Sequence, residues 1–146
     1  MPVTQVNSRV NDFVIKIASV NGTGSASANG LIMKSIFRSG VPVVGKNYFP
    51  SNIQGMPTWY EIRVTRDNHR ARAGQVDIMV ALNAETYARD LAEVASGGYL
   101  IYDSTWPRAA LLKRDDVTVL GVPLARLCNE NFTGVRNRIL VKNICY

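Results

Sequence analysis

Two alternating patterns of hydrophobic and polar positions run along the chain. Short apolar, β-branched runs are typical of strands buried in a parallel sheet. Between them, apolar residues recur every three or four positions, which is typical of amphipathic helices. The predicted strands cover residues 13–20, 41–44, 58–65, 76–82, 99–102 and 117–122. Strands that alternate with helices predict an α/β fold: a three-layer α/β/α sandwich with a Rossmann-like, mostly parallel sheet of about five strands.

The first predicted helix opens near Ser25, covers residues 28–39 and ends at Gly40, a residue type that often follows a helix. Its shared face is expected to consist of Leu31, Ile32, Ser35, Ile36 and Ser39. The second has Asn83 as its N-cap and Glu85 in its first turn, runs to about Ala95, and is stopped by Gly97-Gly98. Pro123 introduces a short helix over 124–128, and a last helix covers 135–144.

A long Asn-, Gly- and Pro-rich connection spans residues 45–57. Connections of this length in a compact domain are usually functional or mobile. The strand before it is expected near a sheet edge because of Pro42, which cannot donate a ladder hydrogen bond. The strand after it, 58–65, has a polar edge and is expected to be exposed.

The turn Asn21-Gly22-Thr23-Gly24 between the first strand and the first helix is the best candidate for a ligand-facing loop. Backbone N–H groups at a helix N-terminus lack intrahelical partners, and glycine lets an anion approach them. Gly22 and Gly24 fit the first two positions of the dinucleotide fingerprint G-x-G-x-x-G, but Ser27 occupies the third. A dinucleotide-binding module therefore stays an alternative, as does a non-catalytic interaction domain.

Composition indicates one soluble globular domain. The chain has 146 residues, 47% of them hydrophobic and 19% charged, with a loose tail expected over 1–11 and the domain over 12–146. No apolar run approaches the roughly 20 residues of a membrane helix, and the N-terminus lacks a secretory h-region. We therefore expect a cytoplasmic protein that does not bind a membrane.

The net charge of +6 is unevenly distributed, because residues 1–72 hold nine Lys or Arg and three Asp or Glu. This distribution favours an anionic ligand or an acidic partner, although a solvated basic face explains it equally well. Cys128 and Cys145 lack metal-site spacing and are expected to be buried free thiols, while His69 is expected in a solvated loop. We expect no metal site, no catalytic residue and no nucleic-acid binding.

The blocks NGTGSASANG and KNYFPSNIQGMPTW, followed by NAET and GGYLIYDS, resemble the gamma domain of 2-oxoacid:ferredoxin oxidoreductases. The chain is most similar to the N-terminal domain of the alpha subunit of 2-oxoglutarate:ferredoxin oxidoreductase, over nearly all of residues 12–146. The resemblance implies an enzyme that oxidatively decarboxylates a 2-oxoacid to an acyl-CoA and reduces ferredoxin. It implies thiamine diphosphate, Mg²⁺ and iron–sulfur clusters on other chains, so the isolated chain should be inactive.

The resemblance also implies partners and a partial coenzyme A site. The partners are alpha and beta subunits or domains, contacted through the aromatic loop 48–57 and Trp59. The residues that match the relatives' glycine-rich turn and second loop are Gly22, Thr23, Gly24, Ser25, Ser51, Asn52 and Gln54. Backbone N–H groups and hydroxyls of the turn could hold phosphates, and the second loop could bind the nucleotide end. Lys46 is the nearest cation in sequence.

Overall fold

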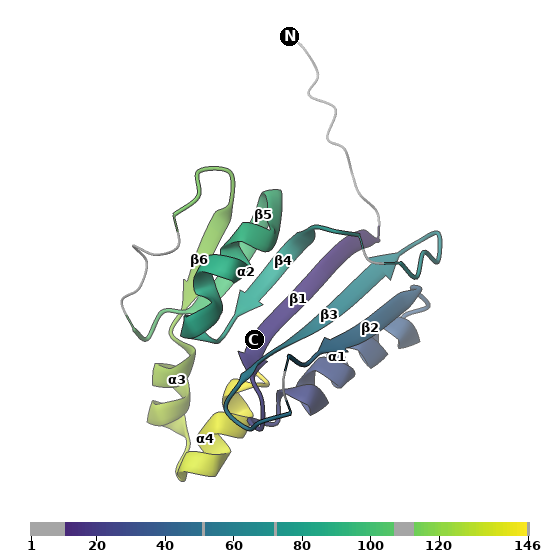
Figure 1. Cartoon of the computed structure of the whole chain (residues 1–146). Coiled ribbons are helices and arrows are strands. Elements are labelled where there is room, and N and C mark those ends of the chain that lie inside the picture. Colours follow the sequence, from purple (N-terminus) through teal and green to yellow (C-terminus); the bar gives the residue numbers. More distant parts are fainter. Residues whose placement is uncertain (1–10, 51, 72, 107–112, 146) are drawn as a thin grey trace.

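A computed structural model describes residues 11–50, 52–71, 73–106 and 113–145. Its centre is a six-stranded mixed sheet in the order β2-β3-β1-β4-β5-β6 (Figure 1). The pairs β1–β4, β4–β5 and β5–β6 are parallel, whereas β2–β3 and β3–β1 are antiparallel. The predicted α/β fold with a mostly parallel sheet is thus confirmed, with six strands. Their bounds are β1 Asp12–Val20, β2 Val43–Tyr48, β3 Pro57–Thr65, β4 Val76–Ala81, β5 Val94–Asp103 and β6 Thr118–Val122.

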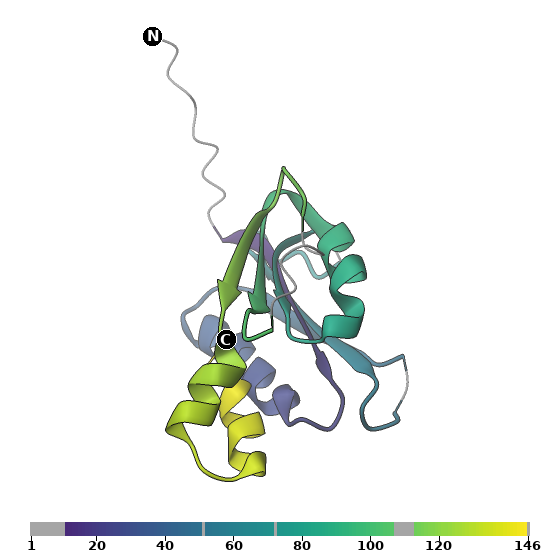
Figure 2. The ribbon, with the colours of Figure 1, turned by 90° about the vertical axis from the view of Figure 1, so that its left-hand side faces the viewer.

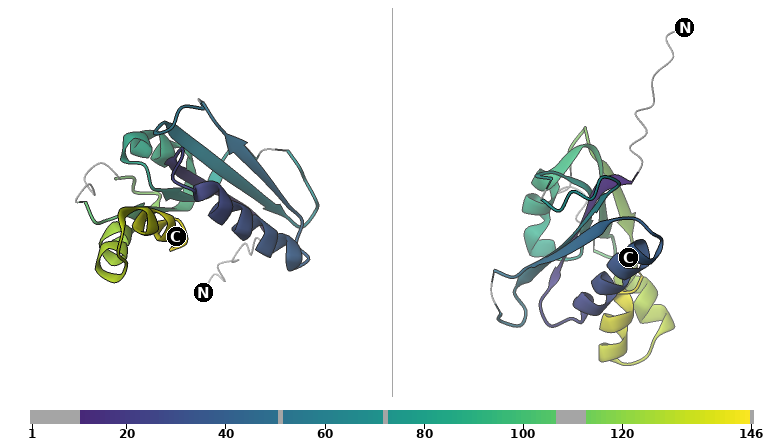
Figure 3. Two further views of the ribbon diagram at one scale, coloured as in Figure 1. Left: turned by 90° about the horizontal axis from the view of Figure 1, so that it is seen from below. Right: turned by 90° about the vertical axis from the view of Figure 1, so that its right-hand side faces the viewer.

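Helices cover both faces of this sheet. Figures 2 and 3 show α1 and α2 on opposite faces, and α3 and α4 side by side at one end of the molecule. One buried cluster packs Tyr87 and Leu91 of α2 against β1, β4 and β5, and the other packs Ile32 and Ile36 of α1 against β1 and β3. None of the helices in the described part of the chain has the length and apolar character to cross a membrane. The helices are α1 Ser25–Arg38, the short 3-10 helix η1 Ala84–Thr86, α2 Tyr87–Glu93, α3 Leu124–Asn131 and α4 Val135–Lys142.

The buried face of α1 differs from the predicted one. Ser25 and Asn29 are buried, and Ile32, Met33 and Ile36 pack on the sheet, so the inward stripe follows helical spacing from Ser25. Leu31 lies outside this stripe and is 63% exposed, which makes its predicted inward position wrong.

The second helix ends earlier than predicted. Asn83 caps η1, the 3-10 turn that leads directly into α2, because its side chain accepts a hydrogen bond from the Glu85 N–H at 3.1 Å. However, β5 begins at Val94, and Gly97 and Gly98 lie inside this strand rather than stopping a helix. The β4–β5 pairing shifts register between Val76 and Ile78, and a Cβ at Gly98 would lie 2.8 Å from the Asp77 carbonyl oxygen. These two glycines therefore allow the irregular backbone of β5 at this register shift.

The hairpin side of the sheet also differs in detail. β2 lies at the edge, as predicted, but continues to Tyr48, which shortens the connection before β3. β3 lies between β1 and β2 and is largely buried, so the expectation of an exposed strand is wrong. Its polar residues misled the prediction because two of them, Thr58 and Glu61, are buried among neighbouring strands and side chains.

The two C-terminal helices differ slightly from their predicted bounds. α3 is three residues longer than predicted, and α4 ends at Lys142. Most of the expected tail, residues 1–10, lies outside the described residues.

Candidate functional site

The glycine turn joins the carboxyl end of β1 to the amino end of α1. Gly22 has a φ of 87° and Gly24 a φ of 85°, a left-handed region that disfavours residues with a Cβ. Gly24 is the N-cap of α1, and no side chain caps this helix. The first turn of α1 therefore presents backbone N–H groups and the positive end of the helix dipole.

The second loop is held directly against this turn. The Asn21 N–H donates to the Met56 carbonyl at 2.8 Å, the Gly55 N–H donates to the Asn21 carbonyl at 3.0 Å, and the Asn21 side-chain amide donates to the Ile53 carbonyl at 3.2 Å. A Cβ at Gly22 would lie 2.7 Å from Cγ of Gln54. The structure thus brings the predicted turn and the predicted loop together.

The predicted site residues differ in their exposure and in whether their polar groups are already hydrogen-bonded within the turn. Asn52 and Gln54 are exposed, whereas Ser51 lies outside the described residues. The Thr23 hydroxyl donates to the Val20 carbonyl at 2.8 Å, and the Ser25 hydroxyl lies 2.9 Å from that of Ser19, inside the fold. These hydroxyls already take part in the turn, so the backbone N–H groups are its main donors toward a ligand.

A cavity of about 340 Å³ lies between the turn and the adjoining ends of β2 and β3. Polar side chains of Asn29, Asn47 and Thr58 line it together with the half-exposed ring of Phe49. Its size falls at the lower end of the range for small-molecule sites, and its lining combines an aromatic surface with several polar groups.

The C-terminal helix α4 packs on the other side of the turn, which the sequence did not indicate. The Asn143 side-chain amide donates to the Thr23 carbonyl at 2.7 Å, and a Cβ at Gly24 would lie 2.8 Å from Cδ2 of Leu140. A cavity of about 510 Å³ separates the turn from α4, and Arg136 lines it.

Arg136, rather than Lys46, is the cation that lines a cavity at the turn. Lys46 lies on β2, its Nζ is 5.2 Å from the centroid of the Tyr48 ring, and it lines a different pocket. Lys46, the nearest cation in sequence, therefore lines neither of the two cavities described at the turn. The basic character of residues 135–142 was visible in the sequence, but no local pattern placed this helix beside the turn.

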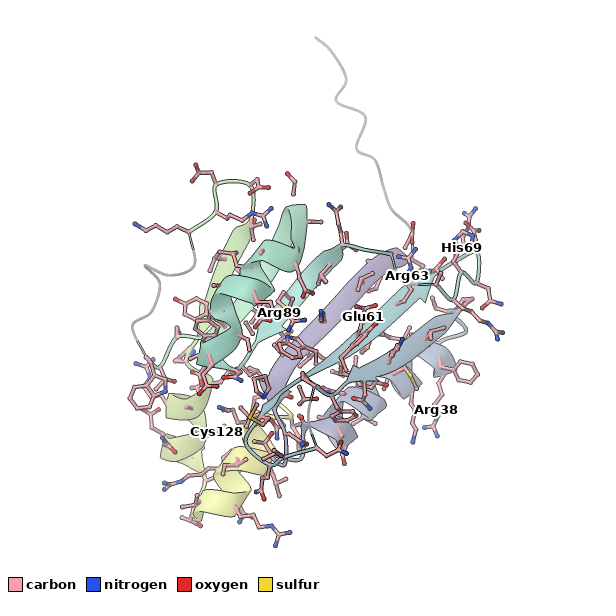
Figure 4. The ribbon with its side chains drawn as sticks, viewed as in Figure 1. Arg38, Glu61, Arg63, His69, Arg89 and Cys128 are labelled. Carbon is pink, nitrogen blue, oxygen red and sulfur yellow. The ribbon has the colours of Figure 1, made fainter. Side chains whose placement is uncertain are left out.

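A buried polar network lies on the α2 face of the sheet. The Trp59 indole N–H donates to the Asp90 carboxylate at 2.8 Å, the Thr86 hydroxyl donates to it at 2.6 Å, and Arg89 lies 4.3 Å from the Trp59 ring centroid. Figure 4 shows Arg89 on the same side of the sheet as Glu61. Trp59 is only 3% exposed, so its predicted role in docking a partner is wrong.

The charges in this network shift each other's pKa values. Burial raises the pKa of Asp90, and the hydrogen bonds from Thr86 and Trp59 offset part of that rise. Burial also acts to raise the pKa of Glu93, but the hydrogen bond and charge of the buried Lys16 outweigh it and lower that pKa. This network stabilises the fold beneath the loop, and one of its members, Trp59, also lines the cavity beside the turn.

The two cysteines differ in environment. Cys128, on α3, is buried, and its pKa is raised by burial and by the neighbouring Cys145 thiol. Cys145 is exposed, so the prediction of two buried thiols is wrong for this residue. In the described parts of the chain, no group of three or more His, Cys, Asp or Glu side chains could hold a metal ion.

Comparison with known proteins identifies the family. The model of the pyruvate ferredoxin/flavodoxin oxidoreductase family matches residues 14–146. The chain belongs to this family. The alpha subunit of 2-oxoacid:ferredoxin oxidoreductase 2 from Aeropyrum pernix is 30% identical to this chain over 121 residues. These residues make up 83% of this chain and 18% of that subunit. The chain thus spans less than a fifth of this relative, and its resemblance to 2-oxoacid:ferredoxin oxidoreductases is confirmed.

Solved structures share the fold. The 2-oxoglutarate:ferredoxin oxidoreductase from Magnetococcus marinus, with 2-oxoglutarate, coenzyme A and succinyl-CoA bound, matches at a TM-score of 0.77 and 22% identity, over 92% of this chain and 23% of that one. The gamma subunit of a keto/oxoacid ferredoxin oxidoreductase from Geobacter sulfurreducens matches at a TM-score of 0.67 and 18% identity, over 90% of this chain and 70% of that one. Pyruvate oxidoreductase subunit PORC from Thermotoga maritima matches at a TM-score of 0.64 and 12% identity, over 92% of this chain and 96% of that one.

Proposed function

We propose that residues 12–146 form the gamma-type domain of a 2-oxoacid:ferredoxin oxidoreductase and contribute to its coenzyme A site. The whole enzyme would oxidatively decarboxylate a 2-oxoacid, with 2-oxoglutarate as the proposed substrate, to an acyl-CoA and pass electrons to ferredoxin. Family membership supports the reaction class. The ligands of the Magnetococcus marinus enzyme support the choice of 2-oxoglutarate and coenzyme A.

Other subunits would hold the redox and decarboxylation chemistry. A cubane iron–sulfur cluster takes four cysteine thiolates, and this chain has two cysteines, so its residues do not fit such a cluster. We therefore assign thiamine diphosphate, Mg²⁺ and the clusters to alpha and beta partners. The isolated chain is expected to be inactive.

The observation that carries the coenzyme A proposal is the joining of the turn and the second loop. Three hydrogen bonds from Asn21 or to it hold the loop at the uncapped amino end of α1. Backbone N–H groups there suit phosphate oxygens, and both glycines keep bulky side chains away from them. Arg136 adds a positive charge that suits the same anion.

The nucleotide end of coenzyme A would then lie toward the second loop. Asn52 and Gln54 present exposed amides that can donate and accept hydrogen bonds, and Ser51 belongs to the same stretch of sequence. The half-exposed ring of Phe49 offers a surface on which a base can stack.

The test compares two activities of the assembled enzyme. Gln54→Ala and Arg136→Gln should each raise the KM for coenzyme A about three- to tenfold, the loss expected for one polar or charged contact. Decarboxylation of the 2-oxoacid without coenzyme A should stay unchanged, because these residues would not touch the oxoacid. A substitution at Gly24 is less informative, since its left-handed φ and its contact with Leu140 would disturb the fold.

The matched control is Lys34→Gln, which removes an exposed charge from α1 away from the turn. It should alter neither activity. If the Gln54 and Arg136 variants reduced both activities together, or changed neither, the turn would be structural and the coenzyme A assignment would be wrong.

A further inference from the structure

The outer edge of β2 is an open strand edge. β2 is the first strand of the sheet, and in the described part of the chain it pairs with β3 alone. The Thr65 N–H donates to the Pro42 carbonyl at 3.1 Å, which fixes the phase of the antiparallel ladder. Because hydrogen-bonded pairs recur every second residue, the N–H groups of Val43, Gly45 and Asn47 point away from β3. These donors form a template for a further strand.

This edge lies along a groove rather than on a flat surface. A cavity of about 760 Å³ runs along residues 40–45, and Phe37 of α1, Asn68 and Arg70 also line it. The Phe37 side chain is 67% exposed, although a ring of this size is usually buried. An added strand would therefore find apolar surface on one side of the edge in addition to the free backbone donors.

The charges around the edge are positive. Lys46 and Arg70 are exposed and line a second pocket of about 240 Å³ with Arg63 on the α2 side of β2. Figure 4 shows Arg63 and Glu61 on this side of β3. The acid that lines this pocket, Glu61, is buried and has partners within the chain, so exposed positive charge dominates. The groove therefore suits carboxylates.

We propose that the outer edge of β2 docks an extended acidic segment of another protein, which adds to the sheet as a further strand. Side chains alternate along a strand, so those on one face would meet Phe37 and Val43. Those on the other face would meet Lys46 and Arg70. Asn47 also lines the cavity beside the glycine turn, but the docking proposal does not depend on the proposed coenzyme A site.

Charge argues against two other occupants. The first ten residues of the chain, MPVTQVNSRV, contain Arg9 and no carboxylate side chain. A second copy of the chain would bring Lys46 and Arg70 toward the same residues of its neighbour, and like charges opposite one another destabilise strand pairing.

The test uses a synthetic peptide of about nine residues with alternating valine and glutamate, the length of an ordinary strand. It is titrated to about 1 mM against the isotopically labelled 146-residue chain and followed by NMR. The peptide should shift the resonances of β2 and slow hydrogen exchange at the outward N–H groups of Val43, Gly45 and Asn47. The same peptide with lysine in place of glutamate should bind at least about tenfold more weakly.

Substitutions distinguish the contribution of the backbone N–H groups to peptide binding from that of the charged side chains. Asn47→Pro removes one outward N–H without breaking the ladder to β3, and should abolish the protection of Val43 and Gly45 by the peptide. Arg70→Glu and Lys46→Glu should each weaken binding about five- to tenfold, because each reverses an exposed charge beside the carboxylates. Lys34→Glu, an equal reversal on α1, should leave binding unchanged.

Several results would overturn the proposal. They are the absence of β2 shifts at the highest peptide concentration, equal binding of the two peptides, and unaltered binding by the Arg70 and Lys46 variants. Protection of the outward N–H groups in the free chain would also overturn it. Loss of that protection on deletion of residues 2–10 would identify the tail as the occupant, and concentration-dependent dimerisation in sedimentation would identify a second copy.

Discussion

The Asp90 carboxyl group is fully buried and accepts hydrogen bonds from the Trp59 indole and the Thr86 hydroxyl. Its raised pKa means that folding favours the protonated carboxyl, so its stabilising contribution is greatest at low pH and falls as pH rises through the folded-state pKa. Glu93 has the opposite sign, since its lowered pKa makes its contribution fall with decreasing pH. The two groups therefore work against each other in mildly acidic solution.

Two variants of Asp90 separate hydrogen bonding from charge. Asp90→Ala should lower the free energy of unfolding by about 2–4 kcal/mol, because it leaves the buried Trp59 indole N–H without its acceptor and removes one of the two acceptors of the Thr86 hydroxyl. Asp90→Asn should cost less than about 1 kcal/mol, since Thr86 can accept from the amide and donate to the Asn83 carbonyl, its second acceptor at 3.1 Å.

Urea unfolding at several pH values measures both effects. The Asn variant should lose the fall in stability with rising pH that Asp90 contributes, while the Glu93 contribution stays in both proteins. Equal unfolding free energies for the Ala variant and the wild type would contradict this account of the network.

At the scale of single elements, two glycines have opposite roles. Gly98 lies inside β5, where a Cβ would meet the carbonyl oxygens of Asp77 at 2.8 Å and Ala95 at 2.9 Å. Gly30 lies inside α1, where a Cβ would have no neighbour within 4 Å. Backbone atoms beside Gly98 cannot move aside easily, whereas glycine in a helix interior costs stability relative to alanine.

We therefore predict that Gly98→Ala destabilises the chain by about 1–3 kcal/mol and that Gly30→Ala stabilises it by about 0.5–1 kcal/mol. Thermal and urea unfolding of the two variants give the comparison, each serving as the control for the other. A Gly98 variant as stable as the wild type would show that β5 accommodates a side chain at this position.

At the scale of the whole molecule, the possible contact surfaces lie in different places. The glycine turn and α4 lie at the carboxyl ends of the parallel strands, whereas β2 forms one lateral edge of the sheet (Figure 1). The second loop exposes Phe49 by 50%, Ile53 by 67% and Met56 by 42%, although Trp59 is buried. This loop therefore keeps the apolar surface expected of a contact with alpha and beta partners.

We predict that the chain co-elutes with the remaining subunits in size-exclusion chromatography and that Ile53→Asp weakens this association at least about tenfold. A charge on an apolar contact must be desolvated, which explains the direction of the change. Leu31→Asp, at an equally exposed apolar position on α1, is the matched control and should co-elute like the wild type. Co-elution unaffected by Ile53→Asp would place the interface elsewhere.

Local sequence patterns predicted a large part of the fold and one half of the candidate site. Apolar runs located the six strands, Asn83 was identified as a cap, and Gly22 and Gly24 marked the turn before α1. These features depend on neighbouring residues, because strand period, capping and a left-handed φ are properties of short stretches of backbone. The end of α2 was missed because Gly97-Gly98 suits a helix stop and an irregular strand equally well.

Tertiary structure alone decided what surrounds the turn. Asn143 reaches Thr23 across 120 positions of sequence, which brings α4 and Arg136 to the glycines. Trp59 is an aromatic residue of the kind that often anchors interfaces. It is buried here because α2 packs over it and Asp90 accepts a hydrogen bond from its indole N–H. The sequence by itself indicated most of the short segments that are strands, helices and turns, but not all of their ends. The contacts between distant segments depend on how the whole chain buries its apolar surface, and no local pattern encodes them.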